Sequence, residues 1–131
     1  MFAIPVFDVA GPGIVFFVFG MGLLALCVLT ALIVVVETAV LFFLKWGTFK
    51  HSLLASLVMN LVTTLIGGGL IFLFSNVYMA LLASFVLSVL IEGGVLLLFN
   101  RETVGKNWIA ALAANAASYL LILLPAVLIF R

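Results

Sequence analysis

Apolar residues run through this chain almost without a break, and polar residues interrupt them at only three places. Hydrophobic residues make up 69% of the sequence and charged residues 7%, whereas soluble domains carry roughly 25% charged residues. A spanning helix needs about 20 apolar residues. The sequence therefore predicts an all-α integral membrane protein, with a single domain over residues 1–131 and four transmembrane helices. We expect the spans within residues 14–44, 52–74, 77–99 and 108–130.

The first predicted span is longer than a membrane requires. Its 31 or so residues would measure roughly 46 Å as a helix, against a hydrocarbon core of about 30 Å. We therefore predict a tilted helix that protrudes at its N-terminal side, with a start near Gly20–Gly22 as the alternative. Residues 1–13 are expected to form an interfacial segment that ends at Gly11–Pro12–Gly13.

An acidic residue and an asparagine recur at a fixed spacing. Glu37 and Asn60 are matched by Glu92 and Asn115, both at an offset of 55 residues. The ungapped alignment of residues 23–76 with 78–131 also matches several apolar residues, among them Ala55 with Ala110 and Leu65 with Leu120. We interpret the chain as two tandem helical hairpins, a parallel repeat with a pseudo-twofold axis along the membrane normal.

Basic residues indicate the orientation. Four of the five lie in the connections between spans 1 and 2 and between spans 3 and 4: Lys45, Lys50, Arg101 and Lys106. The positive-inside rule places these connections in the cytoplasm, so we expect a multi-pass protein of the cytoplasmic (inner) membrane with both termini outside. Trp46 and Trp108 fall on the same side, where we expect them and the four basic residues to anchor the chain at the membrane interface.

The Glu and Asn pairs are predicted to lie at matching depths, about 12 to 15 Å from the basic side. We expect each carboxyl to be uncharged and hydrogen-bonded to its asparagine, because burial disfavours the ionised form. Small or weakly polar residues recur near them at four-residue intervals and predict close helix packing: Ser52, Ser56 and Thr64 around Asn60, Ala80, Ser84 and Ser88 before Glu92, and Ala110, Ala114 and Ser118 around Asn115. Gly67–Gly69 and Pro125 are expected to loosen their helices.

Several classes of function lack the residues they need. His51 is the only histidine, so we predict an interfacial loop residue and neither a metal site nor a bound cofactor. No nucleophile, base and oxyanion donor can be combined from this inventory, so we do not expect an enzyme. A net charge of +1 without a basic patch argues against nucleic-acid binding.

Two family resemblances are limited to single helices. The length, the four spans and the carboxyl in the first span resemble the small multidrug resistance transporters. Met59–Asn60–Leu61–Val62 followed by Gly67–Gly69 is similar to the asparagine-bearing helix of small fluoride channels, although the arginine and phenylalanine motifs of that family are missing. Neither resemblance carries a functional residue over to this chain.

Three functions fit the pattern. The first is an accessory or scaffolding subunit that packs apolar faces against other membrane subunits, or against copies of itself, in the lipid bilayer. The second is a small proton-coupled transporter or channel in which Glu37 and Glu92 titrate, because an ionisable group inside a membrane commonly marks a pathway. The third is a subunit that contacts a pigment, a lipid or a quinone. A transporter requires water to reach the carboxyls, whereas a scaffold requires them dry and paired.

Overall fold

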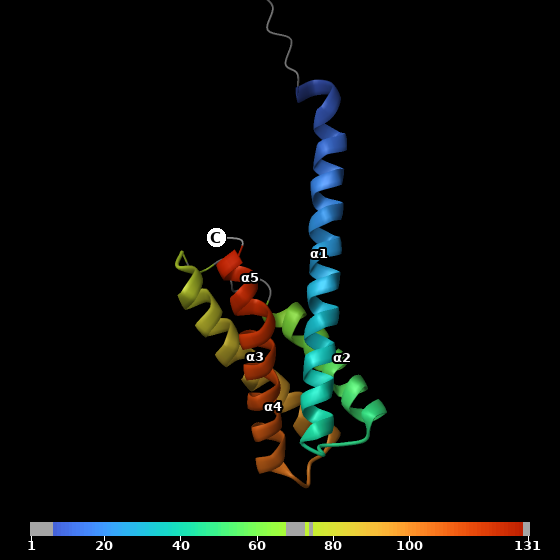
Figure 1. Ribbon diagram of the computed structural model, residues 1–131, viewed down its shortest axis with the longest axis vertical. Coiled ribbons are helices and arrows are strands. Elements are labelled where there is room, and N and C mark those ends of the chain that lie inside the picture. Colours follow the sequence, from blue (N-terminus) through green and yellow to red (C-terminus); the bar gives the residue numbers. More distant parts are fainter. Residues whose placement is uncertain (1–6, 68–72, 74, 130–131) are drawn as a thin grey trace, which may run out of the picture. The chain divides into compact units, whose positions relative to one another are not determined.

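A computed structural model describes residues 7–67, 73 and 75–129, with side chains from Gly20 onward. In this part of the chain the elements are helical (Figure 1). They are α1 (Phe7–Phe43), α2 (Phe49–Gly67), α3 (Val77–Phe99), α4 (Val104–Ser118), the π-helix η2 (Tyr119–Leu123) and α5 (Leu124–Ile129). Among the described residues, four helical stretches are long and apolar enough to cross a membrane, as the sequence predicted: Gly20–Phe43, Phe49–Gly67, Val77–Phe99 and Val104–Ile129.

The chain divides into two compact units, Met1–Ala31 and Leu32–Arg131. The described part of the first unit is the N-terminal stretch of α1, which begins at Phe7 and continues through Gly11–Pro12–Gly13. The sequence predicted that the N-terminal segment ends at these residues, whereas the helix continues through them. Pro12 removes one backbone donor close to the helix start, where few preceding carbonyls lose a partner. An interfacial position for residues 1–13 stays a prediction, and Met1 to Val6 lie outside the described residues.

Helix boundaries in the second unit follow local sequence signals. The range predicted for the third span, 77–99, coincides with α3. Asn76 caps this helix, because its side-chain oxygen accepts from the backbone N–H groups of Tyr78 (2.9 Å) and Met79 (3.3 Å). Helix α2 begins at Phe49, before the predicted start, and Gly67 is its last described residue. The loosening predicted at Gly68 and Gly69 falls outside the described residues.

The fourth span changes its winding just before the proline. Helix α4 is followed by η2, and the N–H of Leu124 donates to the carbonyl of Tyr119, five residues earlier. Pro125 lacks the N–H that would continue an α-helical ladder, and its ring crowds the carbonyl four residues before it. A π-helical turn widens the backbone at that point. The loosening expected from Pro125 thus takes the form of a π-helix.

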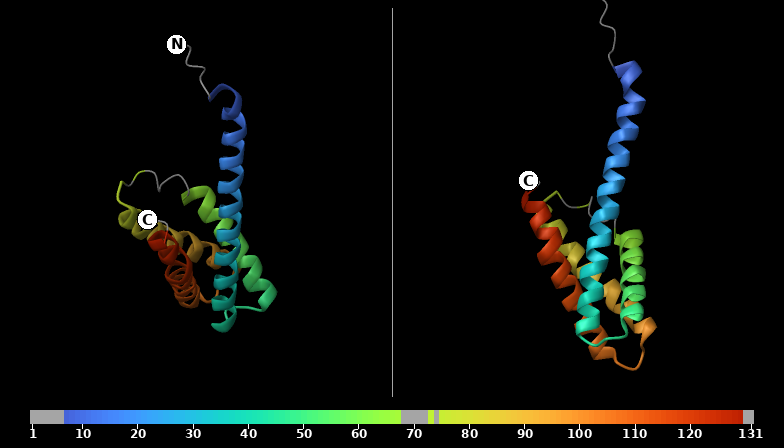
Figure 2. Two further views of the ribbon diagram at one scale, coloured as in Figure 1. Left: turned by 45° about the horizontal axis from the view of Figure 1, so that its top comes forward. Right: turned by 45° about the vertical axis from the view of Figure 1, so that its right-hand side comes forward.

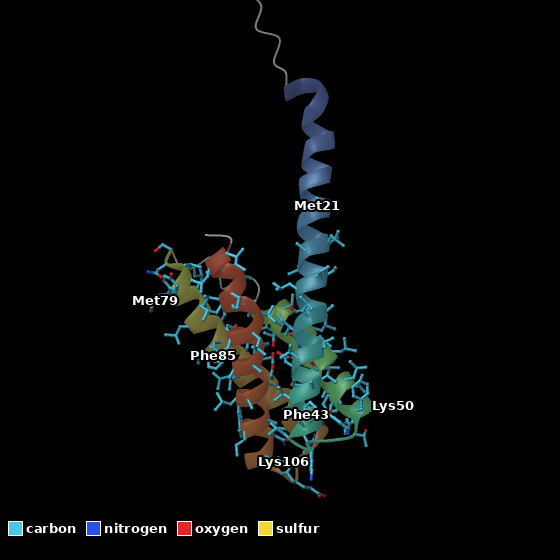
Figure 3. All side chains as sticks on the ribbon, in the orientation of Figure 1. Met21, Phe43, Lys50, Met79, Phe85 and Lys106 are labelled. Carbon is cyan, nitrogen blue, oxygen red and sulfur yellow. The ribbon has the colours of Figure 1, made fainter. Side chains whose placement is uncertain are left out.

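The α1–α2 and α3–α4 connections lie at the same end of the second unit (Figures 1 and 2). The ammonium group of Lys106 donates to the carbonyl of Lys45, and the indole N–H of Trp46 donates to Asn107 Oδ1 at 2.7 Å. Lys50 and Lys106 are labelled at this end in Figure 3, while Met79 lies toward the opposite end. We call it the basic end, because it carries Lys45, Lys50, Arg101 and Lys106, all exposed.

The two tryptophans occupy sites inside the helix packing. Trp46 is only 5% exposed and belongs to the hydrophobic core, so its ring does not face headgroups as the sequence suggested. Its indole N–H is satisfied by Asn107, which makes burial of the ring favourable. Trp108 is half-buried and lies over Gly93 so closely that a Cβ atom there would stand 2.3 Å from Trp108 Cζ3. Helices α3 and α4 can therefore approach each other closely at Gly93, because this residue has no side chain.

The core is small and lies toward the basic end. Leu41, Met59 and Leu96 are fully buried, and they pack with small residues that include Ala55 and Ala110. Most other large apolar side chains are exposed on the outside of the helices. This distribution suits a hydrocarbon solvent, in which exposed leucine carries no penalty and small residues let helices approach.

Candidate functional site

Glu37 is buried between three helices of the second unit, with 1% of its surface exposed. Its Oε2 atom accepts hydrogen bonds from Asn60 Nδ2 and, at 3.1 Å, from the hydroxyl of Ser56, both on α2. Its Oε1 atom accepts from the hydroxyl of Ser118, the last residue of α4, at 3.2 Å. Both oxygens of a carboxyl group in the apolar interior thus have polar partners, which burial without water requires.

Glu92 occupies a comparable site on α3 and is 2% exposed. Asn115 Nδ2 on α4 donates to its Oε2 at 2.7 Å, and the hydroxyl of Thr63 on α2 donates to its Oε1 at 3.3 Å. The structure therefore brings together Glu37 with Asn60 and Glu92 with Asn115, as the depth count from the basic connections predicted.

Each asparagine is fixed by a second bond. The carboxamide nitrogen of Asn60 also donates to the backbone carbonyl of Ser56, and that of Asn115 donates to the carbonyl of Ala111, both at 3.0 Å. Because the same Nδ2 atom serves a helix carbonyl and a carboxyl group, the side chain cannot turn away without losing both bonds. The carboxamides thus hold the carboxyls at set positions.

The two carboxyl sites are connected through crossed hydrogen bonds. Helix α2 donates to Glu37 through Asn60 and to Glu92 through Thr63, about one turn later. Helix α4 donates to Glu92 through Asn115 and to Glu37 through Ser118. We call the eight residues of these bonds the carboxyl network: Glu37, Ser56, Asn60, Thr63, Glu92, Ala111, Asn115 and Ser118.

The sequence analysis did not predict that two residues, Thr63 and Ser118, bind the carboxyl groups. Thr63 was not singled out, and Ser118 was assigned only to helix packing. A signal for both existed: they carry hydroxyls at the same 55-residue offset as the Glu and Asn pairs. Thr64, which the four-residue stripe on α2 included, is exposed. Four residues advance a helix by about 40° beyond one full turn, so a four-residue stripe drifts off the buried face and Thr63 takes the inward position.

The remaining packing positions are nearly all buried. Ser52, Ser56, Ser88, Ala110 and Ala114 are buried, and Ser84 is half-buried. The hydroxyls of Ser52 and Thr38 have no hydrogen-bond partner although both are buried. Ser88 Oγ and Tyr119 Oη lie 3.5 Å apart, which links α3 to η2 next to the network.

An apolar groove lies outside the network, between α3 and the stretch that runs from the end of α4 into α5. It has a volume of about 300 Å³, and its lining residues are Leu81, Leu82, Phe85, Ala116, Tyr119, Leu120 and Leu124. None of its lining residues is a carboxyl or a carboxamide.

The carboxyl, carboxamide and hydroxyl groups gathered at the site can form hydrogen bonds and bind protons. No group of three or more His, Cys, Asp or Glu side chains that could hold a metal ion occurs among the described residues. His51 is exposed at the basic end, where its ring lies 5.2 Å from that of Trp46 and 5.5 Å from that of Phe99. Comparison with known protein families, curated proteins and solved structures finds no match to this chain.

Proposed function

We propose that this chain is an accessory or scaffolding subunit of a membrane protein complex, without catalytic activity of its own. One observation carries the proposal: the carboxyl and carboxamide groups of the interior bind one another. Glu37 and Glu92 are almost completely buried, and their oxygens accept hydrogen bonds from carboxamide and hydroxyl groups on α2 and α4. Buried, paired carboxyls are what a structural role requires, because a substrate path would need water to reach them.

The outer surface supports the same proposal. Large apolar side chains project from every predicted span, for example Val86 and Leu90 on α3, which are 51% and 56% exposed. Such faces bind either lipid or the apolar helices of another subunit, and the small size of the buried core leaves most of them available. The partners we propose are transmembrane helices, from other subunits or from a second copy of this chain.

We further propose that the bundle is two tandem copies of one helical hairpin, with both termini on the non-cytoplasmic side of the inner membrane. The carboxyl network supports the duplication, because the bonds from Asn60 to Glu37 and from Asn115 to Glu92 correspond at the 55-residue offset. The crossed bonds from Thr63 and Ser118 correspond at the same offset. The exposed basic end supports the orientation through the positive-inside rule.

Proton-coupled transport is the second candidate. It is favoured by the two carboxyl groups, which lie in the same bundle and share donors on α2 and α4. Ionisable groups within a membrane are costly and commonly functional. In this case Glu37 and Glu92 would carry the transported proton.

Paired substitutions distinguish the two functions. In Glu37→Gln/Glu92→Gln, each glutamine still accepts from its asparagine through Oε1, and its amide can donate to Ser118 or Thr63. A structural role therefore predicts nearly unchanged folding and assembly. Glu37→Leu/Glu92→Leu should instead leave both asparagines without carboxyl partners, at a cost of about 1–3 kcal/mol for each unsatisfied group.

The measurements are unfolding in mixed detergent micelles, co-purification in mild detergent with mass spectrometry, and proton flux into liposomes. The scaffolding proposal expects the Gln variant to fold and to retain whatever subunits accompany the unsubstituted chain. A Gln variant that folds and assembles normally but loses a proton flux seen with the unsubstituted chain would refute it and support transport.

A further inference from the structure

The apolar groove beside α3 is lined by two segments that lie far apart in the sequence. Three of its residues belong to α3, and four come from the stretch that runs from the end of α4 into α5. They are Leu81, Leu82 and Phe85, and Ala116, Tyr119, Leu120 and Leu124. The volume of about 300 Å³ is at the lower end of the range for ligand sites, so the groove has room for one ligand group.

The groove owes its space to Ala116, the smallest of the lining residues. Ala116 lies near the end of α4, one turn before Tyr119 and Leu120, and its methyl group leaves room between these larger side chains and α3. The ring of Tyr119 packs edge-on to Phe85, with the ring centroids 5.2 Å apart, and its hydroxyl lies 3.5 Å from Ser88 Oγ. The wall that Tyr119 forms is therefore fixed by contacts within the bundle.

The lining presents hydrocarbon and almost nothing that can form a hydrogen bond. Six of the seven lining side chains carry no polar atom. The seventh, Tyr119, has its hydroxyl beside the buried Ser88. A polar ligand group in the groove would lose its hydrogen bonds to water without gaining others, which is costly. The groove therefore favours a hydrocarbon chain over a quinone ring or a lipid headgroup.

The groove lies in the half of the bundle away from the basic end. The start of α3 and the end of α5 lie opposite the two basic connections (Figure 1), and Phe85 on this part of α3 is labelled in Figure 3. By the helical rise, Leu81–Phe85 are about 6 to 12 Å from the start of α3, and Tyr119–Leu124 are about 8 to 15 Å from the end of α5. Half of a hydrocarbon core is about 15 Å thick. The groove is therefore at the depth of the acyl chains of the leaflet opposite the basic end.

A helix of a partner subunit is too thick for the groove. An α-helix with its side chains is about 10 Å across, so one turn of about 5.4 Å occupies roughly 400 Å³. The whole groove holds about 300 Å³. Leu82 and Leu120 form its rims and are 58% and 64% exposed, so a helix would rest on them and leave the space over Ala116 unfilled. A single acyl chain is thin enough to lie between the rims.

We propose that this groove binds one acyl chain of a membrane phospholipid from the leaflet opposite the basic end. The chain fills the space over Ala116, and the headgroup stays at the membrane surface, where water satisfies its polar atoms. This assignment goes beyond the scaffolding function, because it gives one part of the apolar surface to lipid. A partner helix at the same place would leave a void and lose the contacts that a chain makes with the lining.

Photolabelling of the full chain in lipid nanodiscs tests the proposal. The probe is a phosphatidylcholine that carries a diazirine midway along one acyl chain, and mass spectrometry of the proteolysed protein identifies the labelled residues. We expect label on the lining residues, above all Phe85 and Leu120. It should exceed the label on apolar residues that are equally exposed but lie outside the groove, such as Leu61 on α2.

Filling the groove should displace the chain. Ala116→Leu places a larger side chain where the acyl chain lies, and it should reduce the label on the groove about tenfold, the factor that corresponds to a typical cost of overpacking. Ala31→Leu makes the same change at an exposed position of α1 that does not line the groove, and it should leave the label unchanged. Circular dichroism shows whether each variant folds.

A second pair of variants alters only exposed side chains and so spares the interior of the bundle. Leu120→Ala removes one rim and should lower the label on Phe85 several-fold. Leu61→Ala truncates a side chain of similar exposure, 60% against 64%, and should not lower it. Tyr119→Phe keeps the ring and removes only the hydroxyl, so the label should stay the same for a ligand that is purely hydrocarbon in the groove.

Three results would overturn the proposal: equal label on the lining residues and on Leu61, equal label in the two members of either variant pair, or loss of label in Tyr119→Phe. Protection of the lining residues from the probe, with label on exposed leucines elsewhere, would assign the groove to a protein helix and would overturn it as well. Co-purification measures the scaffolding function separately, so that proposal can fail while this one holds, and the reverse.

Discussion

Gly93→Ala tests how closely α3 and α4 pack. The added Cβ atom would stand 2.3 Å from Cζ3 and 2.4 Å from Cε3 of Trp108, well inside van der Waals contact. The indole ring is rigid and half-buried, so relief requires the helices to separate or the ring to leave its site. Overpacking of this kind costs about 1–3 kcal/mol.

The neighbouring glycine provides a matched control. A Cβ atom at Gly94 would meet nothing within 4 Å. Both glycines lie inside α3, so replacement by alanine gives each the same gain in helix propensity, up to about 1 kcal/mol. The difference between the two variants therefore isolates the contact with Trp108, and Gly93→Ala should be less stable than Gly94→Ala by about 1–3 kcal/mol.

The assay is reversible unfolding in mixed micelles of mild detergent and dodecyl sulfate, followed by circular dichroism. Trp108→Leu introduced into both glycine variants completes a double-mutant cycle, and the smaller side chain should remove most of the difference between them. Equal stability of the two alanine variants would refute the close approach of α3 and α4 at Gly93. A difference that survives Trp108→Leu would assign the effect to another contact.

Three further predictions concern the basic end. Trp46→Phe should lower the unfolding free energy by about 1–3 kcal/mol, since Asn107 Oδ1 loses its indole donor inside the bundle, and the same unfolding assay measures the change. Lys45 has a left-handed backbone with φ 54°, so Lys45→Gly should raise that free energy by about 1 kcal/mol, whereas Lys45→Ala should not. In a Cys27→Ser background, a cysteine at Thr48 should be protected from an impermeant thiol reagent in intact cells and one at Ser75 labelled, and the opposite pattern would reverse the proposed orientation.

The sequence alone determined the class of the protein and the residues that matter most in its interior. Continuous apolar runs leave no alternative to membrane helices, because only hydrogen-bonded helices or closed barrels satisfy a backbone in lipid, and the runs have helical length. The pairing of Glu37 with Asn60 and of Glu92 with Asn115 was also predictable. Both members of each pair lie at similar distances from a basic connection, so adjacent antiparallel helices place them side by side.

Only the tertiary structure decided how the two pairs are joined and which groups face inward. The crossed bonds of Thr63 to Glu92 and of Ser118 to Glu37 depend on the rotation of α2 and α4 about their axes, which the residue spacing does not fix. Trp46 is buried instead of facing headgroups because Asn107, distant in sequence, supplies the acceptor its indole needs. Composition and periodicity describe each helix separately, whereas these contacts exist only after the helices pack.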